Sequence, residues 1–493
     1  MSAEPLCPGC RERDELILEF RTTVTKLQAR VAELEQQVRE LHALLNQNSS
    51  NSSRPPSTDP PQAPKRPGRE PTGRKPGGQP GHAGHVRTRL PPDRVNKVVR
   101  YWPATCERCQ AELPKAPQPD DPEPAWHQVA EVPRMPAIIT EHQAHGSHCP
   151  ACGHCTWADP SRLRARIPAE IRAHGFGANL AAIVVLMSAL CRGSKRIIEE
   201  FIETVFQVPM SLGTIANLEQ ETSAALSPAY QEAQETVRAA PVKNHALSYE
   251  GADETSWKQA GKKRWLWMAA TQAVACFKIC IGRGKAELRE LLGDAIQGVV
   301  GSDRLSVYNQ VALSLRQVCW SHLKRDFQKW ADRGGEAGLK VGQAGLEAGR
   351  RLFALWRDFR EKRIDRSVLQ TALIPVQDQL RAALDAGEAS DDAPVQRFCR
   401  NILAVYPALW TFARIEGVEP TNNHAERTLR RAVIWRKVSF GNHSEAGCRF
   451  TERILTVVQT LRLQHRPVLD HLRQAITAHR AATPLPALCP TGV

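Results

Sequence analysis

The first strong pattern in the chain is an apolar stripe near the N-terminus. Hydrophobic residues recur at alternating steps of three and four, with charged or amide residues between them, at Ile17, Phe20, Val24, Leu27, Val31, Leu34, Val38, Leu41 and Leu45. This spacing places them on one face of a helix and is typical of a coiled-coil seam. We predict that residues 1–48 form a parallel coiled coil that joins copies of the chain in a homodimer or higher oligomer. The alternative is a single amphipathic helix packed on its own domain.

Beyond residue 240 the apolar pattern becomes that of a sheet. It predicts three strands, a helix and a fourth strand, in that order, at residues 246–253, 264–270, 274–281, 288–296 and 299–300. Asp253 ends the first of these strands and Asp303 ends the fourth. If the two strands are parallel neighbours, their ends meet at one edge of the sheet, and the two carboxylates come together.

Residues 161–240 have helical periodicity instead. Within them, residues 196–226 have the form of a helix, a short turn and a second helix, and Pro209 and Ser211 mark the start of the second, with Ser211 as a plausible N-cap. A helix-turn-helix that reads DNA places its second helix in the major groove. We predict a DNA-binding region here, although any helical hairpin has the same pattern.

Composition narrows the class of partner. Lys and Arg number 66 against 52 Asp and Glu, so the formal net charge is +14, which favours a polyanion such as nucleic acid. Hydrophobic residues make up 42% of the chain, and its 493 residues are enough for several folded cores, which excludes one small binding module. The longest apolar run, Leu180–Cys191, suits a buried helix rather than a bilayer span. We therefore expect a cytoplasmic protein with no membrane partner.

A basic, Pro/Gly-rich linker occupies residues 49–100. From Arg54 to Arg100 it carries eleven basic and three acidic residues, with eleven Pro and six Gly. No hydrophobic core can form from such a composition. The segment is either a solvated spacer or an arm that follows DNA phosphates through counterion release, and we favour the arm.

Cysteine spacing predicts a zinc-binding domain at residues 101–160. Cys106 and Cys109 form one C-x-x-C pair, and Cys149 and Cys152 form another after a 39-residue spacer. Two such pairs supply the four thiolates of a tetrahedral Zn²⁺ site. The stretches HQVAEVP and AIITEHQAH are predicted strands of a hairpin between the pairs. Free thiols are the alternative, and Cys155 is the second choice for the position of Cys152.

A further pair, Cys7 and Cys10, has no partner pair nearby. It could bind metal across a dimer or have no role.

The two aspartates of the predicted sheet suggest metal-dependent chemistry. Adjacent carboxylates raise each other's pKa, and a divalent cation, Mg²⁺ or Mn²⁺, removes that conflict and supports phosphodiester chemistry. Glu426, in the helical stretch TNNHAERTLRRAV, is the candidate third acid. Arg427, Arg430 and Arg431 follow it closely and could meet phosphates.

Each of these acids also has a structural interpretation. Asp253 and Asp303 could be ordinary turn residues at strand ends, and Glu254 could serve in place of Asp253. Glu426 could be the third residue of a capping box in which Asn423 is the N-cap. Their joint occurrence in a basic chain favours catalysis.

Several motifs together are more specific than any one of them. The stretches LLNQNSSNSSRPPS, GGQPGHAGH, ADET, SDRLSVYN, CWSHLKRDF and NNHAERTLR resemble the insertion sequence sixty-six family of transposases, the TnpC-type DDE enzymes. The resemblance implies a multidomain α/β protein with a ribonuclease-H-like core at residues 241–480, a helical insertion at about 336–420 and a tail at 481–493. It implies a DDE triad at Asp253, Asp303 and Glu426, and a zinc domain built on the C-x-x-C pairs.

The function implied is a bacterial, nucleoid-associated transposase. It would bind double-stranded DNA at the terminal repeats of its element and at the target, hydrolyse phosphodiesters and transfer strands, together with small accessory proteins of the same element. A catalytically silent DNA-binding regulator and a nuclease without strand transfer are the alternatives. His322 and Lys324 are expected on a helix after the second acid, where a phosphate contact and a plain surface position are equally open.

Overall fold

The computed structural model describes residues 8–48, 51, 89–132, 136–159, 175–238, 249–333 and 335–489. The chain divides into two compact units, one comprising Pro64–Ala137 and the other Met1–Ala63 with Ile138–Val493. We describe each unit by itself.

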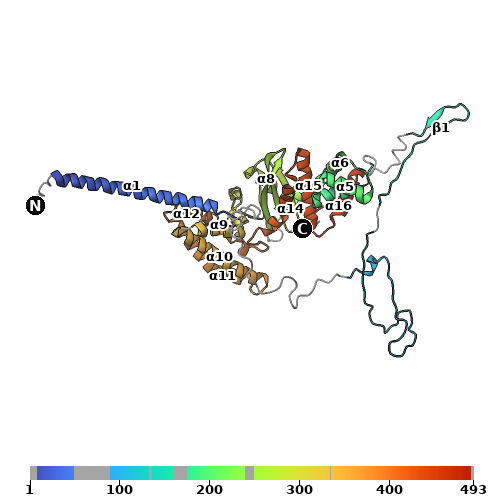
Figure 1. Cartoon of the computed structure of the whole chain (residues 1–493), viewed down its shortest axis with the longest axis horizontal. Helices are drawn as coiled ribbons and strands as arrows, with labels where there is room; N and C mark the ends of the chain where they lie inside the picture. Colours follow the sequence, from blue (N-terminus) through green and yellow to red (C-terminus); the bar gives the residue numbers. More distant parts are fainter. Residues whose placement is uncertain are drawn as a thin grey trace. The chain divides into compact units, whose positions relative to one another are not determined.

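Helix α1, Pro8–Leu45, is one unbroken helix (Figure 1). The nine apolar side chains of the predicted seam all lie on its surface, with exposed fractions between 40% and 75%. At its C-terminal end, the Asn51 side chain donates to the carbonyl of Asn46 at 3.1 Å and to Asp332 Oδ2, also at 3.1 Å. The helix that the heptad pattern predicts is therefore present, and self-association remains a prediction.

The unit Pro64–Ala137 has little regular structure among its described residues. It contains a 3₁₀ turn at Pro92–Arg94 and an isolated antiparallel bridge between Thr105 and Glu112. The predicted strands HQVAEVP, in this unit, and AIITEHQAH, which begins at Ala137 and continues in the other unit, are wrong for the described residues, because neither forms a strand. Their apolar side chains, such as Val129 and Ile138, are exposed and have no facing layer that would stabilise a strand. In the other unit, a short hairpin pairs β1, Gly146–His148, with β2, Cys155–Trp157.

The second unit is built on a five-stranded mixed sheet of order β5-β4-β3-β6-β7. Its strands are β3 Tyr249–Gln259, β4 Lys262–Ala270, β5 Ala275–Cys280, β6 Val299–Ser302 and β7 Arg316–Val318. β3, β4 and β5 pair antiparallel, whereas β3, β6 and β7 are parallel. Helix α8, Lys285–Leu292, connects β5 to β6. The predicted order of three strands, a helix and a strand is confirmed, and β7 was not predicted.

The edge strand β5 is covered by helix α15, Glu445–Leu463. An edge strand leaves every second N–H without a strand partner. Here the N–H groups of Ala275 and Phe277 donate to Thr460 Oγ1 at 3.1 Å and Thr456 Oγ1 at 3.0 Å. The N–H of Ile279 donates to Glu452 Oε1 at 2.6 Å. Side chains spaced by four residues on one face of α15 thus take the place of a sixth strand.

Helices that precede and follow the sheet in the sequence pack against α15 and against one another. They are α4 Ala178–Leu186, the π-helical turn η3 Met187–Cys191, α5 Lys195–Phe206, α6 Leu212–Ala225, α7 Ser227–Arg238 and α16 Val468–Ala481. α4 and α6 both contact α16, and α6 and α7 contact α15. The predicted helix-turn-helix segment is therefore packed against the sheet domain. None of the described helices is long and apolar enough to cross a membrane.

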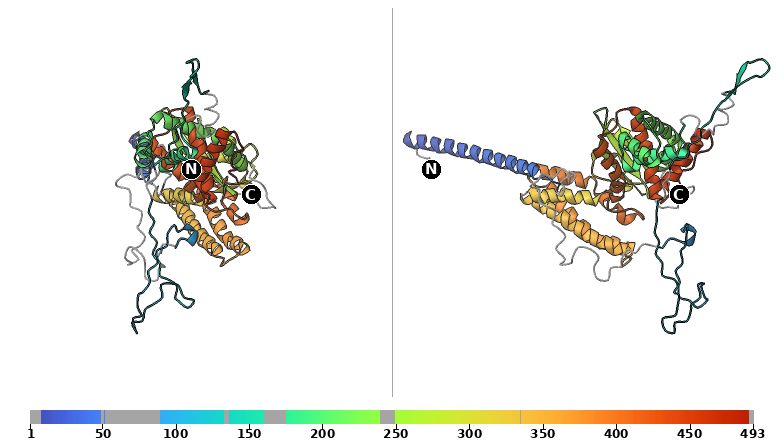
Figure 2. Two further views of the ribbon diagram at one scale, coloured as in Figure 1. Left: turned by 90° about the vertical axis from the view of Figure 1, so that its right-hand side faces the viewer. Right: turned by 45° about the vertical axis from the view of Figure 1, so that its right-hand side comes forward.

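Most of the stretch between the second and third candidate acids is a helical bundle, and its apolar core also includes Val299 of β6 and Val318 of β7. Figure 2 shows its yellow and orange helices gathered together. They are α9 Trp320–Arg333, α10 Glu336–Arg360, α11 Arg366–Glu388, α12 Ala393–Leu403, the turn η6 Tyr406–Leu409 and α13 Thr411–Arg414. The absence of a side chain at Gly345 lets α9 and α10 approach closely. A Cβ at this position would lie 2.1 Å from the Phe327 ring. Helix α14, Asn423–Ser439, then returns to the sheet.

Candidate active site

The two aspartates lie on neighbouring parallel strands. β3 pairs with β6 through Tyr249 with Val299 and Gly251 with Gly301. Continuing this register along the same face places Asp253 level with Asp303, which directly follows β6. The expectation that Asp253 ends its strand is wrong, because β3 continues to Gln259 as the partner of β4. Pairing with β4 and the burial of Trp257 account for the longer strand.

The surroundings of Asp253 disfavour its charge. Burial raises the pKa of this carboxyl to about 8, and the negative charges of Glu254 and Asp303 add to the effect, whereas His322 opposes it. Like charges account for both contributions, from Glu254 beside Asp253 on β3 and from Asp303 at the end of the neighbouring β6. Asp303 is anchored by its own turn, in which Oδ1 accepts the N–H of Leu305 at 2.9 Å.

Glu254 is occupied by other partners. Its Oε1 accepts from Arg283 Nε at 2.9 Å, and its Oε2 accepts from the Tyr308 hydroxyl, also at 2.9 Å. Arg283 in turn lies over the Trp265 ring at 4.6 Å. The Glu254 side chain is buried in this network. It is therefore a structural group, and Asp253 is the better candidate for the acid of β3.

Gly251 allows the start of α14 to reach the sheet. A Cβ at this position would lie 2.4 Å from Asn422 Oδ1 and 2.7 Å from the Cβ of Ala425. Gly251 and Asp253 share a face of β3, because side chains alternate along a strand. Asn422 Nδ2 also donates to the carbonyl of Ala252 at 2.8 Å. Residues 422–426 are thereby held against the part of β3 that carries Asp253.

The capping-box interpretation of Glu426 is wrong. The N-cap of α14 is Asn422 rather than Asn423, and its side chain makes no capping hydrogen bond. The amide of Asn422 bonds across to β3 instead, and the Glu426 carboxylate faces α9. Glu426 is thus free of the local structural role that its position in the sequence suggested.

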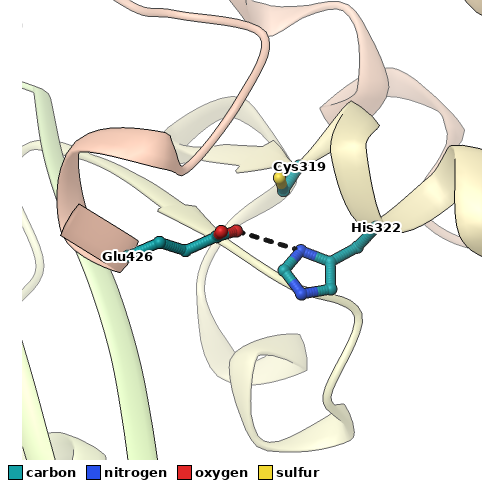
Figure 3. Close-up of side chains that lie close together, drawn as sticks. All are labelled: Cys319, His322 and Glu426. Atoms are coloured by element: carbon teal, nitrogen blue, oxygen red, sulfur yellow. Dashed lines mark ion pairs between the residues drawn. The ribbon is translucent and has the colours of Figure 1, made fainter. Parts of the chain in front are cut away.

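Glu426 faces His322 and Cys319 (Figure 3). His322 Nδ1 lies 3.6 Å from Glu426 Oε1. The ligand atoms of all three residues lie within 4.8 Å of one another, the one such group of three among the described residues. Burial alone would lower the pKa of His322, but the neighbouring Cys319 side chain and the charge of Glu426 raise it to about 9. Asp253 and Asp303 are not part of this group.

Sequence reasoning found only part of this cluster. The sequence indicates His322 for a phosphate contact and assigns no role to Cys319. The spacing C-x-x-H in CWSH was the available signal. Lys324 lies on the exposed side of α9, over the Phe353 ring at 5.6 Å, and so does not point to the acids.

The two C-x-x-C pairs have the same local geometry. Cys106 N–H donates to the carbonyl of Ala111 and Gln110 N–H to that of Cys106, each at 2.9 Å. Cys149 N–H and Gly153 N–H make the equivalent bonds at 2.8 Å, to His154 and Cys149. In both turns the residue after the second cysteine has a positive φ, 63° and 74°.

These turns favour thiolates. The backbone N–H groups of Cys109 and Arg108 lower the pKa of Cys106, and those of Ala151 and Cys152 lower that of Cys149. Cys155 lies outside its turn, on β2 opposite His148, so Cys152 is the better partner for Cys149. The pairs belong to different units, and the shared zinc ion stays a prediction. Cys7 lies outside the described residues.

The predicted helix, short turn and second helix are present as α5 and α6. Ser211 Oγ accepts the N–H of Thr214 at 3.2 Å and caps α6. However, α6 contains no Lys or Arg. Its Glu219 pairs with Lys195, and its Glu221 pairs with Arg480. A role of this helix in reading DNA stays a prediction.

The sheet and its acids define a mixed α/β protein with a carboxylate-rich candidate site. The family model described as Transposase IS66 family matches residues 176–449, more than half of the chain, and the chain belongs to this family. The predicted resemblance is thus confirmed. A second model, of a family of unknown function designated DUF6444, matches residues 4–88.

A curated relative extends this comparison. The chain is 26% identical over 260 residues to the uncharacterized protein y4qI of Sinorhizobium fredii (strain NBRC 101917 / NGR234), covering 46% of this chain and 47% of the relative. The chain therefore spans about half the length of the curated relative it matches.

Proposed function

We propose that this protein is a DNA transposase that hydrolyses a phosphodiester at the ends of its element and joins the freed 3′-hydroxyl to target DNA. The observation that carries the proposal is the register of β3 and β6, which sets Asp253 level with Asp303. Membership of a transposase family supports it. The strand order, with three antiparallel strands followed by two parallel ones, supports a ribonuclease-H-like core.

The residues present fit a divalent metal such as Mg²⁺ or Mn²⁺. Asp253 is a carboxyl whose pKa is raised to about 8 by burial and by its acidic neighbours, and a bound cation would relieve that repulsion. Asp253, Asp303 and Glu426 would hold the metal. Bound there, it would activate the attacking oxygen and stabilise the leaving one.

The chain's own residues would position the DNA. Arg427 and Arg430 are exposed on α14, next to Glu426. Burial lowers the pKa of Arg431, and the positive charges of Arg462 and Arg192 lower it further. Arginines gathered on one helix suit the phosphates of a DNA backbone. The start of α14, held on Gly251, would keep Glu426 near the scissile phosphate.

The remaining parts of the protein would serve assembly and DNA contact. We propose that α1 pairs with a second copy through its exposed apolar stripe. Glutamate at both Val31 and Leu34 should then lower the mass measured by light scattering, and an unchanged mass would place association elsewhere.

We also propose that the four cysteines bind one Zn²⁺ per chain, which Cys106→Ser should remove. We further propose that the basic linker at residues 49–100 contacts DNA phosphates and that small accessory proteins of the same element take part in the reaction.

One assay separates the transposase from its two alternatives. A duplex bearing the terminal repeat that flanks the gene is incubated with target plasmid and Mg²⁺, and nicked and joined products are counted. A transposase gives both, a nuclease gives nicks alone, and a regulator binds without either. Asp303→Asn should abolish both products. Asp294→Asn is the matched control, because Asp294 is an exposed acid ahead of β6. Nicks without joined products would contradict strand transfer.

A further inference from the structure

Cys319, His322 and Glu426 come from two segments that are firmly joined. Cys319 follows β7, and its N–H donates to the carbonyl of Ser302 at 2.8 Å. Its Sγ accepts the N–H of Asn422 at 3.2 Å. The N–H of Trp320 donates to the carbonyl of Pro420 at 2.9 Å. The first turns of α9 and α14 are thereby fixed side by side, with His322 on one and Glu426 on the other.

Two polar atoms in this cluster lack hydrogen-bond partners. His322 Nδ1 and Glu426 Oε1 are both buried without one, although they face each other at 3.6 Å. Buried polar atoms are rarely left in this state, because an unmade hydrogen bond has a desolvation cost. A cation between them would bind both atoms at once.

The distances agree with such an ion. Ligand atoms about 2.0–2.3 Å from one tetrahedral Zn²⁺ lie roughly 3.3–3.8 Å from each other. The separation of 3.6 Å between His322 Nδ1 and Glu426 Oε1 lies just above the roughly 3.3–3.5 Å expected for a nitrogen and an oxygen ligand. The Cys319 sulfur lies within 4.8 Å of both. Small side-chain rotations would bring all three ligand atoms to bonding distance of one ion.

The donor atoms select the kind of metal. A thiolate, an imidazole and a carboxylate suit Zn²⁺ and similar thiophilic ions, whereas Mg²⁺ prefers oxygen ligands. The amide N–H of Asn422 bonds to the sulfur, which is the kind of outer contact that orients a metal ligand. Three protein ligands leave a fourth position for water or a phosphate oxygen.

We propose that Cys319, His322 and Glu426 bind a thiophilic divalent cation such as Zn²⁺, and that this ion competes with the catalytic metal for Glu426. Glu426 is the ligand that the two sites share. When Zn²⁺ holds it toward Cys319 and His322, it is withdrawn from Asp253 and Asp303. The competition rests on the proposed function, whereas the binding site does not.

Binding is tested with Co²⁺ on the full-length protein, because a cobalt–thiolate bond gives a charge-transfer absorption band that Mg²⁺ cannot produce. Wild type, Cys319→Ser and His322→Gln are titrated after removal of bound metal. Each variant should bind one equivalent less than the wild type and show a weaker band. The C-x-x-C pairs remain intact in all three proteins, so their contribution cancels.

Cys448→Ser is the matched control, since Cys448 is a buried cysteine outside the cluster. It should bind as much Co²⁺ as the wild type. His322→Gln keeps the buried sulfur and therefore covers the case in which Cys319→Ser does not fold. Equal stoichiometry and equal bands in the wild type and both cluster variants would overturn the site.

Competition is tested by adding Zn²⁺ to the Mg²⁺-dependent cleavage assay and dividing each protein's rate by its own rate without Zn²⁺. Zn²⁺ should inhibit the wild type, and excess Mg²⁺ should relieve the inhibition. Cys319→Ser should raise the inhibiting Zn²⁺ concentration by at least about tenfold, the scale on which changes around a metal site alter affinity. Equal sensitivity would overturn the competition. Cobalt binding without cleavage under any condition would refute the proposed function and the competition, and would leave the binding site standing.

Discussion

Helices α15 and α14 both bring polar side chains to the sheet, but the hydrogen bonding of these side chains differs. On α15, Glu452, Thr456 and Thr460 each accept an N–H from the edge strand β5. On α14, Glu426 Oε1 is buried with no hydrogen-bond partner and faces an equally unpartnered nitrogen. Buried polar groups that have partners stabilise a fold, whereas two unpartnered atoms that face each other call for an explanation such as an ion or a water that bonds to both. The contrast separates the structural edge of the sheet from its candidate site.

We expect the ionisation of Glu452 to have the largest effect on the free energy of unfolding. Burial raises its pKa to about 7, against the opposing effects of Arg449 and the Ile279 N–H. A carboxyl whose pKa is raised by folding contributes stability below its unfolded pKa and loses that contribution as pH rises through the folded value. Glu452→Gln keeps the acceptor oxygen and cannot ionise. Relative to this variant, the wild type should lose up to about 3 kcal/mol between pH 4.5 and 7.

The measurement is the urea midpoint of both proteins at several pH values. Using the difference between the two removes the effects of other titrating groups. A difference that does not change with pH would mean that Glu452 is charged without penalty.

Thr456 tests the edge contact itself. Thr456→Val removes the acceptor for the Phe277 N–H and leaves that group buried, which should destabilise the domain by about 1–3 kcal/mol. Thr456→Ser keeps the hydroxyl and is the control. Chemical denaturation of the two variants decides the point, because a loss in Thr456→Ser with none in Thr456→Val would show that methyl packing, not the hydrogen bond, is responsible.

Gly251 tests the contact on the other helix. Gly251→Ala would place a methyl 2.4 Å from Asn422 Oδ1, so α14 must move away from β3. We expect a loss of about 1–3 kcal/mol in the free energy of unfolding, together with slower DNA cleavage. Gly213→Ala is the matched control, since its Cβ would have one neighbour, Ser211 Oγ, at 3.7 Å. It should be neutral or stabilise α6 by about 0.5–1 kcal/mol. Full activity in Gly251→Ala would argue against precise placement of Glu426.

Much of the sheet could be predicted from sequence, because β4 contains the apolar run 265–270, β5 is apolar except for Lys278, and α8 has a clear helical period. β7 could not be predicted, since Arg316 and Gln317 are polar and the strand has only three residues. The position of Asp303 at a strand end could be predicted from the short apolar run before it. The end of β3 could not be predicted, because the strand extends past Asp253 as the partner of β4.

The site was harder to predict than the sheet, because its parts are far apart in the chain. The N-cap of α14 is set by a bond from Asn422 to the Ala252 carbonyl, and no local pattern contains that contact. The cluster of Cys319 and His322 with Glu426 likewise depends on how the helical insertion returns to the sheet. Spacing such as C-x-x-H can indicate two ligands of a site, but the third comes from the fold.

The central claim is that Asp253, Asp303 and Glu426 act as one catalytic unit. The most direct test measures Mg²⁺-dependent nicking at the terminal repeat for Asp253→Asn, Asp303→Asn, Glu426→Gln and the triple variant, with DNA binding measured in parallel. Each single change should reduce the rate by about a hundredfold or more. The triple variant should be no slower than the slowest single one, because residues that act as a unit are not additive. Retained nicking in any single variant that still binds DNA would contradict the account.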